Sequence, residues 1–158
     1  MKYRTAVAAL LLAVAFFGVP EVKPRSVAVY AIPEPSSDMK ATVQPIVKVV
    51  SSMNAIDRLW LQNIYLNCAR VVEADGIVDE PTITSTDGLR AVHVAVLAFI
   101  WKGMADNSPE KYPRLAEAID SALNSCVSED SRQITPELRR RAADLYRAIA
   151  WAGLGKDA

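Results

Sequence analysis

Apolar residues recur at three- and four-residue spacing over almost the whole chain from Ser37 to the C-terminus. This spacing matches the period of an α-helix and not the strict alternation of a half-buried strand. The sequence shows no strand pair, no Asn-Gly hairpin turn and no internal repeat. We therefore predict an all-α domain over residues 37–158, folded as a compact bundle of four or five helices.

The expected helices begin after capping side chains and end at turn-forming residues. They cover approximately residues 37–50, 54–74, 86–102, 113–126 and 136–152. Ser36, Ser37 or Asp38 can cap the first helix, in which Pro45 predicts a kink, and Ser85 or Thr86 can cap the third. The clearest start is Thr135 followed by Pro136, with Gly153 just past the end of that last helix.

The third expected helix is the most apolar one in this domain. Its segment Ala91–Trp101 (AVHVAVLAFIW) is apolar on nearly every side, and it is too short to cross a membrane. A helix without a polar face is usually buried by neighbours on several sides. We therefore expect this helix to be the centre of the bundle.

The N-terminus has the pattern of an export signal. Lys2 and Arg4 precede the uncharged stretch 6–19, which Pro20 ends. This stretch fits the apolar region of a signal peptide better than a membrane span of about 20 residues. Small residues at 13–15 and at 29–31 are two candidate cleavage sites, but the first leaves a short apolar region and the second lies far downstream. Residues 1–25 are therefore either a cleaved signal peptide or a retained membrane anchor.

A proline-rich tether over residues 26–36 is expected to connect this segment to the helical domain. Four prolines lie between residues 20 and 35, and proline favours extended, semi-rigid backbone.

The charge balance argues against a nucleic-acid partner. The whole chain has 18 basic and 18 acidic residues, and without residues 1–25 it has 14 basic and 17 acidic ones. A mildly acidic domain is not drawn to nucleic acid or to an anionic membrane surface. The basic cluster 139–141 has acidic residues four positions away on its own helix, so we interpret it as a solvated face.

Cys68 and Cys126 lie on the core-facing stripes of the second and fourth expected helices. In an oxidising compartment they can form a disulfide, which would stabilise the fold by roughly 4 kcal/mol in the chain-entropy model. The alternative is two separate buried thiols that act as small apolar side chains. No Cys-x-x-Cys redox motif is present.

His93 is the single histidine, and it lies on the apolar third helix. We expect it to be neutral and hydrogen-bonded to a backbone or carboxylate group. Catalysis would need a nucleophile beside it, for which Thr84, Ser85 and Thr86 are the nearest hydroxyls, but these residues equally suit a helix cap. We predict no catalytic residue.

An acidic segment follows the second expected helix, and its spacing does not fit an EF-hand loop. Residues 74–80 (ADGIVDE) resemble the helix-turn-helix signature of the tellurite-resistance helical-domain family, in which an Ala-Asp-Gly turn with following acids joins two helices. The resemblance implies a metal role for Asp75, Asp79 and Glu80. Pro81 departs from that pattern, and the alternative is a solvated acidic loop. We predict no metal site and no cofactor.

These observations predict an exported, non-enzymatic helical protein in the periplasm, the extracellular space or on the membrane. We expect it to act as a structural or protein-interaction module of the cell envelope, with another protein as its partner and no small-molecule ligand. Two or more aromatic residues exposed together would mark the partner surface. The alternative is a small membrane-anchored lysis or envelope-remodelling protein of a phage or mobile element.

Overall fold

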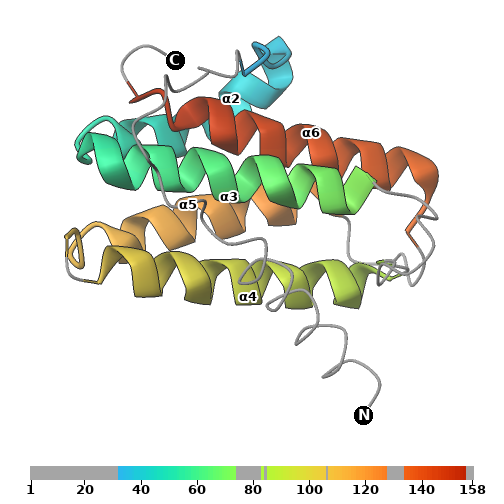
Figure 1. Cartoon of the computed structure of the whole chain (residues 1–158). Helices are drawn as coiled ribbons and strands as arrows, with labels where there is room; N and C mark the ends of the chain where they lie inside the picture. Colours follow the sequence, from blue (N-terminus) through green and yellow to red (C-terminus); the bar gives the residue numbers. More distant parts are fainter. Residues whose placement is uncertain (1–31, 74–82, 84, 106, 128–133, 156–158) are drawn as a thin grey trace, which may run out of the picture.

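The structure, a computed structural model, describes residues 32–73, 83, 85–105, 107–127 and 134–155. These residues form five α-helices and no strand (Figure 1): α2 (Ser37–Val50), α3 (Ala55–Glu73), α4 (Thr86–Met104), α5 (Tyr112–Cys126) and α6 (Pro136–Ala152). The prediction of an all-α bundle is confirmed. Residues 1–31, which include the expected signal or anchor and half of the tether, lie outside the described part.

Capping side chains begin the helices where the sequence predicts. The hydroxyl oxygens of Ser36, Ser85 and Thr135 each accept a hydrogen bond from a backbone N–H three residues later. Asn54 does the same for α3, because its Oδ1 accepts a 2.8 Å hydrogen bond from the backbone N–H of Asp57. These bonds satisfy N–H groups that have no partner within the first helical turn.

The centre of the bundle is α6, so the prediction that the third helix is central is wrong. Figure 1 shows α6 running alongside α3, and α2 and α5 also contact it. In contrast, α4 lies at the edge of the bundle, where its main contacts are with α3 and α5. The most apolar helix therefore keeps one side in solvent.

Small side chains explain why α6 occupies the centre. Its charged residues lower its hydropathy, but its alanines leave little bulk between helices and all of them are buried: Ala142, Ala143, Ala148, Ala150 and Ala152. Just past the end of α6 the chain also passes close to α3, since a Cβ on Gly153 would lie 2.6 Å from Cγ of Gln62. Close helix packing depends on this absence of bulk, which a hydropathy average does not measure.

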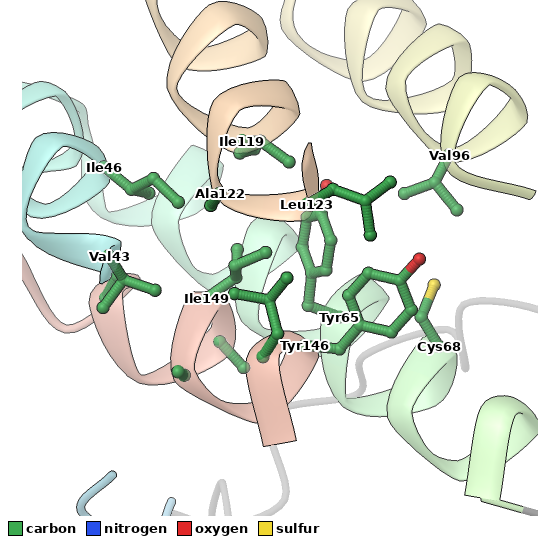
Figure 2. Packing of buried hydrophobic residues seen from close by; sticks show 14 of the residues in the cluster. Val43, Ile46, Tyr65, Cys68, Val96, Ile119, Ala122, Leu123, Tyr146 and Ile149 are labelled. Atoms are coloured by element: carbon green, nitrogen blue, oxygen red, sulfur yellow. The ribbon is translucent and has the colours of Figure 1, made fainter. Parts of the chain in front are cut away.

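The core lies between α3, α5 and α6, with α2 covering one side (Figure 2). Tyr65 from α3 and Tyr146 from α6 are fully buried there, with ring centroids 5.6 Å apart and the planes tilted by 52°. The apolar residues of α5 that recur at three- and four-residue spacing are all buried: Leu115, Ile119, Ala122, Leu123 and Cys126. In α3 the corresponding stripe is Leu61, Ile64, Tyr65, Cys68, Val71 and Val72, and all of it is buried except for Val71, which is half-buried.

None of the helices within the described residues is both long enough and apolar enough to cross a membrane. Pro45 lies inside α2, on its exposed side. The helical domain thus folds around α3 and α6 and leaves α4 partly uncovered.

Candidate interaction surface on α4 and α5

The outer side of α4 carries apolar side chains that no described part of the chain covers. Val94 is 65% exposed and Trp101 is 42% exposed, and Ala98 between them is also exposed. Residues spaced by four and then three positions lie on one side of a helix. These three residues therefore form a continuous apolar stripe along α4.

The stripe borders an open groove of about 480 Å³ between α4 and the start of α5. We call the groove and the stripe together the α4 face. The groove has mostly apolar walls, formed by Val94, Leu97, Ala98, Trp101, Tyr112 and Pro113. Apolar surface gathered in a hollow is typical of a binding site, whereas isolated exposed apolar residues are ordinary.

Tyr112 holds the two sides of the groove together. Its ring lies 4.7 Å from the ring of Trp101, and its hydroxyl donates a 2.9 Å hydrogen bond to the backbone carbonyl of Leu97. Burial raises the pKa of Tyr112, so the hydroxyl stays protonated and keeps donating. The sequence predicted that exposed aromatics would mark a partner surface, but it did not single out Tyr112.

The inner side of α4 packs against α3. The indole of Trp60 stacks on the ring of Phe99 with centroids 5.4 Å apart and planes 22° from parallel. Gly103 makes room for that indole, because a Cβ at this position would lie 2.6 Å from Nε1 of Trp60. This stack and the close approach at Gly103 set which side of α4 faces α3, so the opposite side faces solvent.

Charged groups lie near the α4 face. Asp120 of α5 has a side chain 58% exposed and contacts His93, the residue before Val94. Lys102, the residue after Trp101, is exposed at the opposite end of the stripe. Figure 1 shows that α4 and α5 run in opposite directions, so the face has a carboxylate near one end and an ammonium group near the other.

His93 is buried at 2% exposure, and its Nε2 lies 3.1 Å from Oδ1 of Asp120. Burial lowers the pKa of His93 by disfavouring the charged ring, while Asp120 opposes that shift. The neutral ring then donates its Nε2 proton to the carboxylate. The expected carboxylate partner of His93 is confirmed, and the neutral state of its ring stays a prediction.

The hydroxyls weighed as nucleophiles do not assemble a catalytic site with His93 in the described part of the chain. Ser85 uses its oxygen to cap α4, and Thr86 is buried in the first turn of that helix. Thr84 lies outside the described residues. Nδ1 of His93 is buried and makes no hydrogen bond within the described structure. Among the residues that the structure describes, no hydroxyl nucleophile is shown within hydrogen-bond reach of His93, as acyl transfer would require.

Both cysteines are buried free thiols in the structure. Burial raises the pKa of Cys68 to about 12 and also raises that of Cys126. Sγ of Cys68 points toward the Tyr146 hydroxyl in the core (Figure 2). A disulfide between Cys68 and Cys126 stays a prediction.

The interpretation of residues 139–141 as a solvated face is wrong for Arg139. Its side chain is buried, and its guanidinium donates to the carbonyl of Val72 at 3.1 Å and to that of Ile83 at 2.8 Å. Arg139 therefore joins the end of α3 to the residues before α4, while Arg140 and Arg141 are exposed. Its multiple planar donors suit two carbonyls at once, and sequence spacing gave no sign of these distant partners.

A second buried polar cluster was also missed. Asp57 is 2% exposed, and its Oδ2 accepts hydrogen bonds of 2.9 Å from both Asn54 and Ser108. The cluster joins the start of α3 to the turn after α4. Its only signal in the sequence was an acidic residue three positions after a capping asparagine.

The acidic segment 74–82, including Asp75, Asp79 and Glu80, lies outside the described residues. Within the described part no group of three or more histidine, cysteine or acidic residues is placed to hold a metal ion. Glu73, which precedes the segment, pairs with Arg147 of α6.

Comparison with known proteins finds no matching family model, no matching curated protein and no matching solved structure.

Proposed function

We propose that this protein is an exported helical module that binds another protein molecule through the α4 face. One observation carries the proposal: the most apolar helix lies at the edge of the bundle and exposes Val94, Ala98 and Trp101 beside an apolar groove. Uncovered apolar area of this kind favours a partner, because covering it removes it from water.

The chemistry of the groove indicates what kind of partner it fits. Its walls are aliphatic and aromatic, with Tyr112 already bonded to the backbone of Leu97. Such a groove suits the apolar side of a helix, which is a recurring mode of protein recognition. A non-enzymatic role agrees with the use of Ser85 as a helix cap.

Export is the second part of the proposal, and it rests on residues 1–25. Lys2 and Arg4 before an uncharged stretch are typical of a signal peptide. Retention of that stretch would anchor the helical domain to a membrane, as the alternative role in envelope remodelling or lysis requires.

Export is tested by expressing the full chain with and without residues 1–25 in bacterial cells and fractionating them. We expect the full chain outside the cytoplasm or on the membrane and the truncated chain inside. Equal cytoplasmic recovery of both would contradict export, and intact-mass analysis reports whether the segment has been removed.

Binding is tested by placing a photoreactive benzophenone amino acid at Val94 of the full chain and irradiating the cells. The matched control is Ile56, which is 74% exposed on α3 and does not line the groove. We expect a discrete protein adduct at position 94 that Ala98→Glu abolishes and that position 56 does not form. The absence of such an adduct would overturn the proposal.

A further inference from the structure

We infer that the pocket between the end of α2 and the start of α5 binds a phosphate group, carried either by a soluble compound or by a phospholipid headgroup. The pocket has a volume of about 410 Å³. Its lining is formed by Lys48, Val49, Ser52, Glu110, Lys111 and Arg114. It shares no lining residue with the α4 face, so the inference goes beyond the proposed function and does not depend on it.

The charge of the pocket carries the inference. Three of its lining side chains are cationic, and a single one, Glu110, is anionic. If Glu110 neutralises one of the cations, two positive charges remain. A phosphate monoester has about two negative charges at neutral pH and complements them, whereas a single carboxylate would leave one positive charge unanswered.

The side chains of Lys48 and Arg114 are available to a ligand. Both are exposed, and within the part of the chain that the structure describes neither forms an ion pair or a hydrogen bond. Glu110 is exposed as well and makes no ion pair with any described residue. The two cations therefore have no fixed partner to lose when an anion binds.

Lys111 joins the two walls of the pocket. Its Nζ donates a 2.6 Å hydrogen bond to the backbone carbonyl of Ser52, just after α2, while Lys111 itself directly precedes α5. This bond uses one of the three N–H groups of the ammonium, so two remain to donate to an anion.

The mixture of cations suits the shape of a phosphate group. A guanidinium such as that of Arg114 presents parallel donors that match two phosphate oxygens, while the ammonium groups of lysines act as point charges. The volume of the pocket is within the range of small-molecule sites, so the group attached to the phosphate also has room.

The net charge of the chain does not reveal this cluster. Lys48 lies more than 60 positions before Lys111 in the sequence, and the packing of α2 against α5 brings them together. The domain is mildly acidic as a whole, but salt screens exposed charges beyond about 8–10 Å. A small anion in the pocket therefore responds mainly to the side chains that line it.

Titration with inorganic phosphate tests the site. The full chain, as cells accumulate it, is isotope-labelled and titrated at constant ionic strength with chloride as the replaced anion, while NMR follows the backbone amides. We expect saturable shifts at Lys48, Lys111 and Arg114 with a dissociation constant of about 1 mM. The absence of saturable shifts there up to about 20 mM would overturn the site.

Two matched double variants separate the pocket from general charge attraction. Lys48→Gln with Arg114→Gln removes two lining cations, and Lys102→Gln with Arg140→Gln makes the same charge change at exposed residues outside the pocket. We expect phosphate affinity to fall at least tenfold in the first and less than twofold in the second. Equal weakening in both would overturn the site, and circular dichroism checks that both are folded.

Glu110→Gln tests the position of the anion from the opposite direction. The substitution removes a carboxylate that repels phosphate and competes for the cations, so we expect phosphate to bind several-fold more tightly. An affinity that stays unchanged or falls contradicts the placement of the phosphate group beside Glu110.

Vesicles distinguish the two sources of the phosphate group. The wild type and both double variants are sedimented with equimolar phosphatidylcholine and phosphatidic acid, and with phosphatidylcholine alone; residues 1–25 are the same in all three. Weaker binding to the phosphatidic acid vesicles by the Lys48 and Arg114 variant alone indicates a headgroup site. Equal vesicle binding beside a tenfold difference in phosphate affinity indicates a soluble compound, and no difference in either experiment overturns the inference.

Discussion

The hydroxyl of Ser108 donates a 2.9 Å hydrogen bond to Oδ2 of Asp57, and both side chains are buried. The bond connects the turn between α4 and α5 to the first turn of α3, across 51 positions of sequence. A buried carboxylate is stable only when donors surround it, so this contact fixes the position of the turn relative to α3.

Replacing Ser108 with alanine should lower the free energy of unfolding by about 1–3 kcal/mol, because the buried carboxylate loses a donor. Urea denaturation measures the change. The control is Ser52→Ala, whose hydroxyl is exposed and bonds only the carbonyl of Val49 in its own segment. Equal stability of the two variants would show that the Asp57 cluster contributes nothing measurable.

Arg139→Ala should destabilise the domain by about 3 kcal/mol, since two carbonyls lose a charged donor and the buried alkyl chain is removed. Arg139→Lys should recover only part of that loss, because one ammonium group does not reproduce the planar fork. The matched control is the exposed neighbour Arg140→Ala, which should stay within about 0.5 kcal/mol of the wild type. Thermal or urea unfolding distinguishes the three variants.

Acidification should destabilise the protein through His93. Its pKa is lowered in the fold, so the unfolded chain takes up the proton first, and stability falls as the pH drops from the unfolded value of about 6.5 toward the lower folded value. Each unit of pKa difference corresponds to about 1.4 kcal/mol. His93→Gln should remove this part of the pH dependence.

The measurement is the free energy of unfolding at pH 7.5 and at successively lower pH for the wild type and for His93→Gln. The variant keeps every carboxylate, so the difference between the two pH curves is the contribution of His93. Because the chain has one histidine, its ring resonances also give the folded pKa directly by NMR. A folded pKa above that of the unfolded chain would contradict the prediction.

Gly103→Ala should destabilise the contact between α3 and α4. The new Cβ would lie 2.6 Å from Nε1 and 3.0 Å from Cε2 of Trp60, so the indole that stacks on Phe99 must shift. We expect a net loss of about 1–2 kcal/mol after allowing for the better helix propensity of alanine. The near-ultraviolet circular dichroism of Trp60 should change with it.

Gly88→Ala is the control for this substitution, since its Cβ would approach Oγ of Ser85 only to 3.3 Å. It should be close to neutral in stability. A Gly103→Ala protein as stable as Gly88→Ala would show that the indole has room to shift.

Local signals in the sequence predicted the helices well. Ser36, Ser85 and Thr135 cap helices as expected, and the apolar spacing in α5 identified all of its buried residues. These features depend on residues within one or two turns of each other, which is the range that a sequence pattern reports.

The errors concern relations between distant segments. The apolar character of residues 91–101 suggested a central helix, but centrality depends on how closely neighbours approach, and the alanines of α6 allow a closer approach. Arg139 was assigned to solvent because its partners, the carbonyls of Val72 and Ile83, are more than 50 positions away. The α4 face follows from this same arrangement, so the sequence predicted a partner without predicting where it binds.

The position of α6 also affects when the protein can fold. The helix at the centre follows its main neighbour, α3, by more than 60 residues along the chain. The core therefore cannot close before α6 has been made, and contacts between such distant segments form slowly for a helical protein. The earlier helices lack their central partner until then, and an unfolded chain is the state that a membrane channel for unfolded proteins accepts.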